Sequence, residues 1–275
     1  MHISIILSTY NSPAWLAKSL WGYLAQVDRG FEIVIADDGS GPETAQLIRD
    51  VAANTDITIR HVWQRDDGFR KTRILNKAIL ESRGDYLLFS DGDCIPRNDF
   101  VAVHRKFARP GHFLSGGYFK LPMPVSESID RADIDSGRVF DARWLRASGV
   151  RLLLPYKWWK LTANQPMQEF LNRATPTRAS WNGHNASGWR SDVEAANGFD
   201  ERMRYGGEDR ELGERLVNRG ITPIQLRYSA ICLHLDHARG YVDPEARRIN
   251  DDIRRATRAE KATHTDFGLN LHAKD

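Results

Sequence analysis

Hydrophobic runs and amphipathic segments alternate along the first ninety residues of the chain. The runs "ISIILSTY", "FEIVIAD", "ITIRHVW" and "DYLLFS" are largely apolar, as in strands that are buried on both faces of a sheet. Between them, residues 14–26, 41–53 and 71–82 carry apolar residues at helical spacing, and Pro42 suits the first turn of a helix. Strands that alternate with helices predict an α/β fold with a parallel sheet and right-handed crossovers.

The alternation stops between residues 121 and 180. There, "RWLRASGVRLLLPYKWWKL" interleaves basic residues with Trp and Leu, which indicates an amphipathic helix packed on the core, a lid or an acceptor platform. Residues 206–220 then predict a helix with acids at its start, and residues 221–237 predict one or two strands. The polar tail that follows predicts a surface helix.

Polar and acidic residues occupy the carboxyl ends of the four predicted strands. They are Ser8–Asn11, Asp37–Ser40, Trp63–Gly68 and Asp91–Asp93. This edge of an open α/β sheet is where ligands bind. No GxGxxG follows the first strand, which argues against a dinucleotide bound on a glycine-rich loop.

Asp91 and Asp93 end the fourth strand with one glycine between them. At a strand end, two carboxylates at this spacing can turn toward one point, and a divalent cation would relieve their repulsion. Oxygen ligands suit Mg²⁺ or Mn²⁺, and an added histidine from "HLDH" (His234, His237) would favour Mn²⁺. A solvated turn rich in Asp and Gly is the alternative, and the spacing alone does not choose between them.

Glu208 and Asp209 follow two glycines at the predicted start of a helix, in "YGGEDREL". Adjacent carboxylates near a metal site suit general-base work, because one can take a proton while the other orients the hydroxyl. Acids are also common at helix starts for electrostatic reasons alone. The motif therefore supplies a candidate general base, but it does not by itself assign that role to either residue.

Two further groups could contact a nucleotide. The carboxylate of Asp37 or Asp38 could accept hydrogen bonds from a base or a ribose, or close an Asx turn. Arg70 and Lys71 begin a predicted helix after "DDGF" and could neutralise phosphates, or they could be exposed helix cations.

Composition narrows the class of protein. The 275 residues include 41% hydrophobic and 27% charged residues, which is ordinary for a globular protein, and a net charge of +3 gives no indication of nucleic-acid binding. The two cysteines, Cys94 and Cys232, form no CxxC and fit a reducing compartment. No apolar run approaches the roughly 20 residues of a membrane span, so we expect a cytoplasmic protein whose contact with lipid is peripheral.

Taken together, "SIILSTYN", "EIVIADDGS", "RDDGFRKTRILNKAI" and "GDYLLFSDGDCIP" resemble the family-2 glycosyltransferases of the GT-A fold. "NGFDERMRYGGEDRELGERLVNRG" and "HLDH" resemble the carboxyl-terminal half of β-1,4-galactosyltransferases, polypeptide N-acetylgalactosaminyltransferases and bacterial chondroitin polymerases. The two patterns cover residues 3–120 and 181–240. The resemblance implies a Rossmann-like, mixed and mostly parallel sheet flanked by helices, in a single domain with a helical C-terminal tail.

The resemblance also implies roles for matching positions at the donor. Asp37 matches the acid that contacts the uracil or ribose of a UDP-sugar, with Thr9 and Asp67 nearby. Asp93 matches the direct ligand of Mn²⁺ or Mg²⁺, and Asp91 faces the ribose or the metal shell.

For the acceptor and the metal, the resemblance implies four more positions. Asp209 matches the catalytic base of inverting galactosyltransferases, and Glu208 its neighbour that holds substrate hydroxyls. Either His234 or His237 matches the carboxyl-terminal metal ligand. The chain departs from the pattern at Tyr205, where tryptophan is usual.

The expected function is metal-dependent transfer of a hexose or N-acetylhexosamine from a UDP-sugar to a hydroxyl of a glycan or lipid-linked acceptor. We expect the reaction to invert the configuration at the anomeric carbon. We also expect the enzyme to act in bacterial-type surface polysaccharide synthesis at the inner face of the membrane. Residues 1–120 would bind the nucleotide sugar, 121–180 would be a variable acceptor or lid segment, 181–240 would bind the acceptor and catalyse, and 241–275 would be the tail.

Two rival functions and one rival stereochemical outcome remain at this point. A sugar-phosphate nucleotidyltransferase should carry a glycine-rich basic loop where this chain has "STYNSP". A non-catalytic nucleotide- or carbohydrate-binding module would have no need of Asp209. Retention of configuration is the alternative to inversion, because the polypeptide N-acetylgalactosaminyltransferases retain.

Overall fold

The computed structural model describes residues 1–151, 154–238 and 243–272. The strands are β1 (Ile3–Thr9), β2 (Phe31–Asp37), β3 (Ile59–Trp63), β4 (Tyr86–Asp91), β5 (Cys94–Pro96), β6 (His112–Lys120), β7 (Ala186–Trp189) and β8 (Thr222–His234). Parts of the basic and aromatic segment and of the tail fall at 152–153, 239–242 and 273–275, outside the described residues. The four strands predicted in the first ninety residues are confirmed.

The helices of the first half are α1 (Pro13–Leu24), α2 (Pro42–Ala53), α3 (Lys71–Glu81) and α4 (Phe100–Phe107). The middle of the chain forms α5 (Met123–Ser128), α6 (Arg131–Asp135), α7 (Ala142–Ala147), α8 (Trp159–Thr162) and α9 (Gln165–Ala174), with 3₁₀ turns at Arg138–Phe140 and Pro155–Trp158. The last part forms α10 (Arg190–Ala195), α11 (Glu208–Asn218), α12 (Pro244–Ala259) and a 3₁₀ turn at Leu269–Leu271. None of the described helices is both long and apolar enough to cross a lipid bilayer.

The described strands form one sheet in the order β3-β2-β1-β4-β7-β6-β8-β5. The strands β1 to β4 are parallel, β7 runs antiparallel between β4 and β6, β8 is parallel to β6, and β5 is antiparallel to β8. This confirms the mixed, mostly parallel sheet. The parallel strands β1, β2, β3 and β4 end at the same edge, so their last residues meet there.

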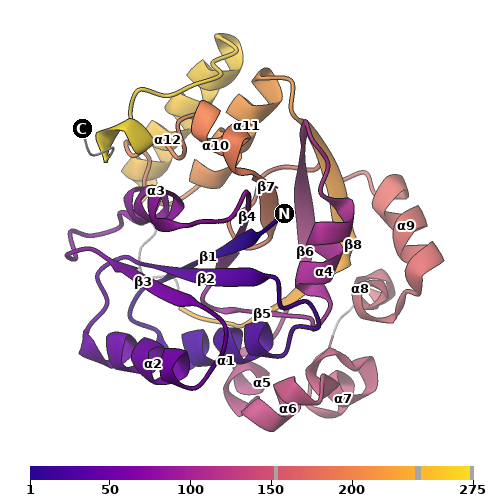
Figure 1. Ribbon diagram of the computed structural model, residues 1–275. Helices are drawn as coiled ribbons and strands as arrows, with labels where there is room; N and C mark the ends of the chain where they lie inside the picture. The colour runs from indigo at the N-terminus through magenta and orange to yellow at the C-terminus, as the bar shows by residue number, and fades with distance from the viewer. Residues whose placement is uncertain (152–153, 239–242, 273–275) are drawn as a thin grey trace.

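Side-chain alternation along the strands divides the core into two layers. Ile5 of β1 faces α1 and α2, together with Leu20 of α1, whereas Ile6 faces α3 and contacts the layer of Ile74. Figure 1 shows α1 and α2 on one face of the sheet and α3 on the other. Because both faces are covered, β1, β2 and β4 are mostly apolar, and acidic residues of the site lie at the carboxyl ends of β2 and β4.

The segment from 121 to 180 has no strand among its described residues and builds a third core of its own. Val125, Ile134 and Leu145 pack there with Phe119 of β6 and Leu233 of β8. The stretch for which an amphipathic helix was one of the expectations is divided between α7, a 3₁₀ turn and α8. Short helices replace one long helix because Gly149 has a φ of +98° just after α7, in the left-handed region that ends a helix.

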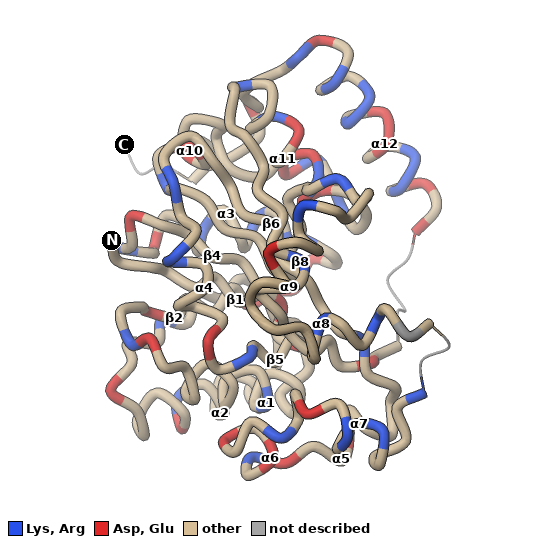
Figure 2. The backbone as a smooth tube through the Cα atoms, turned by 90° about the vertical axis from the view of Figure 1, so that its right-hand side faces the viewer, with Lys and Arg blue, Asp and Glu red and all other residues tan. Residues whose placement is uncertain are grey.

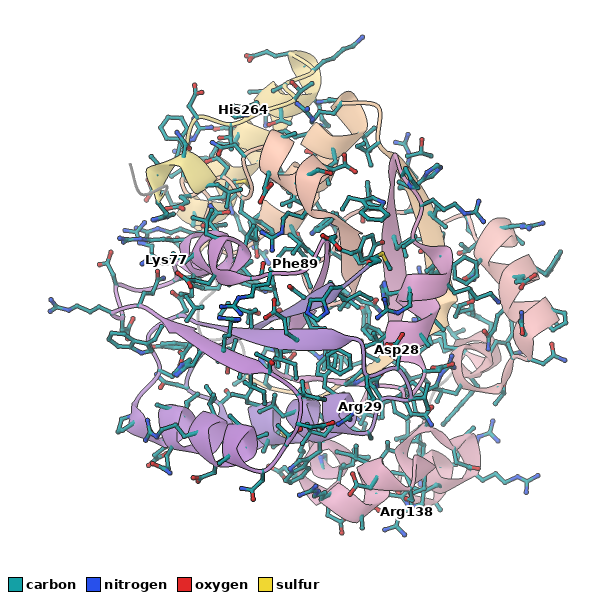
Figure 3. The ribbon with its side chains drawn as sticks, viewed as in Figure 1. Asp28, Arg29, Lys77, Phe89, Arg138 and His264 are labelled. Carbon is teal, nitrogen blue, oxygen red and sulfur yellow. The ribbon has the colours of Figure 1, made fainter. Side chains whose placement is uncertain are left out.

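An aromatic cluster at the centre of the molecule packs between β4 and α11. Phe89 of β4, labelled in Figure 3, packs edge-on against Trp181 and Phe199, with ring centroids 5.5 Å away in each case. Trp181 is fully buried and also meets α11, where a Cβ at Gly213 would lie 2.7 Å from the Trp181 side chain. The cluster therefore packs β4 and Trp181 against the middle of α11.

A buried ion pair anchors α11 to its neighbours. Arg215 donates to Glu211 at 2.7 Å, and both side chains are 1% exposed. Arg215 also donates to the backbone carbonyls of Ala196 and Gly198, and Thr257 of α12 donates to Glu211 at 2.9 Å. The pair joins α10, α11 and α12 in one hydrogen-bonded network.

We predict that Arg215→Met lowers the free energy of unfolding by about 3–5 kcal/mol, because Glu211 would remain buried without its cation. Arg219→Met, in the exposed C-cap of the same helix, should change it by less than about 0.5 kcal/mol. Urea unfolding followed by circular dichroism measures both. Equal effects of the two substitutions would contradict the anchoring role of the buried pair.

Candidate functional site

Two adjoining cavities open at the carboxyl edge of the sheet. The edge cavity has a volume of about 450 Å³ and lies over the ends of β1 and β4, with Thr9, Asp38 and Asp93 in its lining. The outer cavity, of about 710 Å³, is lined by β6, β8 and the start of α11, including Asp209. The two cavities share the residues Lys71, Asp91, Tyr205, Glu208 and His234.

Lys71 and Asp91 form an ion pair where the cavities meet. Lys71 Nζ lies 2.6 Å from Asp91 Oδ1, which also accepts a hydrogen bond from Ser8 Oγ at 2.7 Å. Burial alone would raise the pKa of Asp91, but the Lys71 charge and these hydrogen bonds outweigh it and hold the pKa well below its usual value. Burial alone would lower the pKa of Lys71, and the charges of Asp91 and Glu208 raise it instead.

Asp93 faces two histidines rather than Asp91. Its Oδ2 lies 3.1 Å from Nε2 of His237 and 3.9 Å from Nε2 of His234. The Nδ1 of His234 lies 2.8 Å from the carbonyl oxygen of Leu235, and the Nδ1 of His237 lies 2.9 Å from that of Ala238. A carbonyl oxygen only accepts, so each Nδ1 carries a proton, and a neutral ring would then present the lone pair of Nε2 toward Asp93.

These three groups fit a divalent metal. One carboxylate oxygen and two imidazole nitrogens converge, and the backbone carbonyls orient both rings as outer partners of metal-bound histidines do. Cys94 also lies within 4.8 Å of the ligand atoms of Asp93 and His234. Burial, with Cys232 beside it, raises the pKa of the Cys94 thiol well above its usual value, so the group stays protonated and is a poor ligand.

Glu208 and Asp209 begin α11 and face different cavities. Gly206 and Gly207 precede them with φ values of +114° and +89°, a conformation that favours glycine. The Gly206 N–H donates to Glu208 Oε2 at 2.8 Å, and the Gly183 N–H donates to Asp209 Oδ2 at 2.7 Å. Burial and the neighbouring Asp209 raise the pKa of Glu208 to about 7. Glu208 lines both cavities, whereas Asp209 lines the outer one.

At the end of β2, the structure places Asp38, not Asp37, in the edge cavity. Asp37 is fully buried and accepts from the Ser40 N–H at 2.8 Å, with His61 Nε2 2.8 Å from its other oxygen. Asp38 accepts from Gln64 and from the backbone N–H of Arg70. Successive strand residues face opposite sides of the sheet. A shift of one position therefore separates an acid that is buried in the fold from an acid that lines the cavity.

The remaining expected donor residues lie at different depths. Thr9 lines the edge cavity, and its buried Oγ1 has no hydrogen-bond partner within the described residues. Arg70 and Asp67 pair with each other at 3.3 Å near the surface, and neither side chain lines the edge cavity. The backbone N–H of Arg70 nevertheless holds Asp38 in place at 2.9 Å.

The family model "Glycosyl transferase family 2" matches residues 4–116, which contain β1 to β4 and the edge-cavity acids. The first part of the chain is therefore similar to the family-2 glycosyltransferases. Together with its glycosyltransferase relatives, this likeness indicates that the chain is a glycosyltransferase enzyme. The Bacillus subtilis (strain 168) glycosyltransferase YfnE is 27% identical over 92% of this chain and 68% of its own length. This glycosyltransferase spans about half the length of the next two curated relatives.

Two solved structures share the GT-A fold of this glycosyltransferase. One is the Pyrobaculum calidifontis mannosyltransferase PcManGT in complex with GDP-Man and Mn²⁺, with 20% identity, a TM-score of 0.58 and coverage of 94% of this chain and 62% of that one. The other is S. aureus TarS 1–349 in complex with UDP-GlcNAc, with 15% identity, a TM-score of 0.64 and coverage of 95% and 69%.

Several aromatic residues of this glycosyltransferase complete the edge cavity and were not among the expected site residues. Tyr10, Trp15 and Phe69 line it, and Phe69 meets Tyr205 edge-on with ring centroids 5.7 Å apart. Tyr10 directly follows β1, and Phe69 lies in the loop between β3 and α3. These positions at the ligand edge are the sequence signal that could have found them.

We predict that Glu208→Gln stabilises this glycosyltransferase at pH 8 and has little effect at pH 4.5. The folded-state pKa of Glu208 is about 7 against an ordinary value of 4.5, so wild-type stability is lost as pH rises between these values. The difference should reach as much as about 3 kcal/mol above pH 7. Urea unfolding at both pH values without added metal measures it. The exposed Glu81→Gln should show no such dependence, and a pH-independent effect of Glu208→Gln would contradict the raised pKa.

Proposed function

We propose that this glycosyltransferase moves a hexose or N-acetylhexosamine from a UDP-sugar to an acceptor hydroxyl, with inversion. The observation that carries this proposal is the junction of two cavities. One cavity contains the candidate metal ligands, and the other contains a carboxylate. The donor would occupy the edge cavity and the acceptor the outer cavity. Their reacting atoms would meet beside Lys71 and Glu208, which line both cavities.

The lining of the edge cavity supports a nucleotide diphosphate. The Asp38 carboxylate can accept hydrogen bonds from a base N–H or a ribose hydroxyl, and the unpartnered Thr9 hydroxyl can bond to the same ligand. Tyr10 and Phe69 offer apolar ring surface for a planar base. A UDP-sugar is consistent with TarS, whose structure contains UDP-GlcNAc.

Asp93, His234 and His237 would hold a divalent cation, for which we propose Mn²⁺, as in the mannosyltransferase complex. When bound, such a cation offsets the negative charge that develops on the departing diphosphate. Lys71 contributes a fixed positive charge at the same junction, and its raised pKa keeps it protonated at neutral pH. Asp91, paired with Lys71, would then orient that ammonium more than it would bind the metal.

Asp209 would act as the general base. The Gly183 N–H holds Oδ2, and Asp209 lies in the cavity that we assign to the acceptor. The carboxylate would take the proton of the acceptor hydroxyl while that oxygen forms a bond to the anomeric carbon, and UDP would leave from the opposite face with the bonding electron pair. Glu208, half protonated near pH 7, can both donate to and accept from sugar hydroxyls.

We predict that Asp209→Asn lowers the kcat of sugar transfer by about 10²–10⁴-fold and leaves the affinity for the UDP-sugar unchanged. Asp93→Ala should instead remove the Mn²⁺-dependent part of donor binding. Thermal shift with a panel of UDP-sugars and Mn²⁺, together with assays of UDP release, separates the two effects. Asp56→Asn, 79% exposed on the surface and paired with Arg29, serves as the control. Absence of a response to every UDP-sugar would overturn the proposed function.

We also propose a peripheral contact with the inner face of a bacterial membrane, in keeping with a lipid-linked acceptor for surface polysaccharide synthesis. Tyr156, Trp159, Met167 and Phe170 are 47–64% exposed on and around α8 and α9. Exposed aromatic residues next to basic ones suit an anionic lipid surface, where the rings enter the headgroup region.

Trp159→Ala with Phe170→Ala should lower sedimentation with phosphatidylglycerol-containing vesicles by severalfold and leave UDP binding unchanged. The matched control replaces exposed apolar residues elsewhere, Val27 and Val217. Vesicle binding that is equal in both double variants would argue against this surface as the membrane contact.

A further inference from the structure

The wall of the outer cavity carries more positive charge than the carboxylates around it can balance. Its described lining includes eight Lys or Arg residues and four acids. Lys120 is paired with Asp236 at 3.0 Å, and Arg254 with Glu214 at 2.6 Å. In Figure 2, Lys and Arg appear along α12 and around α8, on two sides of the strands that line this cavity.

Three of these cations form a group, which we call the cationic triad: Lys160 of α8, Arg178 and Arg227 of β8. Arg227 donates to Thr177 Oγ1 at 2.8 Å, which places the Arg178 loop against β8. Lys160 donates to the carbonyl oxygen of Tyr118 at 2.6 Å. Among the described residues, none of the three has a carboxylate within ion-pair distance.

The triad is costly without an anion. Burial, together with the nearby charges of Arg227 and Lys157, lowers the pKa of Lys160 to about 8. The chain thus keeps cations close together, and the partners described for Lys160 and Arg227 are neutral: the carbonyl oxygen and ring of Tyr118 and the hydroxyl of Thr177. An oxyanion would relieve this repulsion and take the unused guanidinium donors.

The diphosphate of the donor does not account for this charge. Asp93, His234 and His237 gather at the edge cavity with Lys71, whereas Lys160, Arg178 and Arg227 line the outer cavity and not the edge cavity. The outer cavity is also the one that contains Asp209. The cations therefore face whatever molecule presents a hydroxyl to Asp209.

We propose that the acceptor carries an oxyanion, either a phosphate ester or a sugar carboxylate, which the cationic triad binds while a neutral hydroxyl of the same molecule faces Asp209. This inference rests on the proposed function and narrows its substrate class from any glycan or lipid-linked hydroxyl to an anionic one. Arginine forks suit both kinds of oxyanion because they donate two parallel hydrogen bonds. The anion also fixes which end of the acceptor points toward the catalytic carboxylates.

Isothermal titration of the full chain, saturated with UDP and Mn²⁺, tests the proposal with two matched pairs of probes. Glycerol 3-phosphate is compared with glycerol, and trigalacturonate with maltotriose. At least one anionic probe should bind ten or more times more tightly than its neutral counterpart, and the pair that shows the difference tells phosphate from carboxylate. Raising the salt concentration should reduce that difference.

Lys160→Gln with Arg227→Gln should abolish the preference for the anionic probe and leave UDP affinity unchanged, and the variant should not be less stable to heat. The control is Arg73→Gln with Lys77→Gln, an equal loss of charge on α3 at residues that line neither cavity (Figure 3 labels Lys77). Equal binding of neutral and anionic probes, no binding of either anion, or a preference that survives the double variant would overturn the proposal. Failure to bind UDP would instead overturn the proposed function.

Discussion

The ion pair between Lys71 and Asp91 is the contact on which the geometry of the site depends. It joins the first residue of α3 to the last residue of β4, at a nitrogen–oxygen distance of 2.6 Å. The same ammonium acts on Glu208 and Asp209 of α11, whose negative charges help to raise its pKa. Three segments that are far apart in the sequence thus converge on one charge, and without it three carboxylates would repel one another in a partly buried space.

This arrangement explains why Asp91 and Asp93 behave differently although only a glycine separates them. The spacing suggested two carboxylates directed at one cation. In the structure, Lys71 and Ser8 already satisfy one oxygen of Asp91, and Asp93 alone faces the histidines. The sequence shows both acids at the strand end but not the lysine twenty positions earlier, because that pairing arises only when α3 packs on the sheet.

Much of the first half of the fold could be predicted because its signals are local and repeated. Continuous apolar strands, amphipathic helices and acidic strand ends all indicate a parallel sheet with a ligand edge. The difference between Asp37 and Asp38 could not be predicted in this way, since a shift of one residue at a strand end leaves the composition of the motif unchanged. The two acids differ in their contacts, such as the hydrogen bonds from Ser40 to Asp37 and from Arg70 to Asp38.

The second half was harder to predict because its strands are defined by contacts with distant residues. The strand β7 has four residues, including a glycine, and β6 contains Gly116 and Gly117, which lower strand propensity. A Cβ at Gly116 would lie 2.0 Å from Asn185 Oδ1, and one at Gly117 would lie 2.1 Å from the carbonyl oxygen of Arg227. These glycines are required by the close approach of neighbouring strands, which no local pattern reveals.

The distribution of charge gives the two cavities different roles toward a negatively charged substrate. The edge cavity offsets charge with Lys71 and with imidazoles that can hold a cation, next to the point where a diphosphate would depart. The outer cavity places the cationic triad and the two carboxylates of α11 in one lining. The cationic triad would attract an anionic acceptor, and the carboxylates of α11 would repel it. The acceptor would therefore enter with its charged group against Lys160, Arg178 and Arg227. Its neutral hydroxyl would then be the part left to face Asp209, and electrostatics alone would set the orientation in which the base can act.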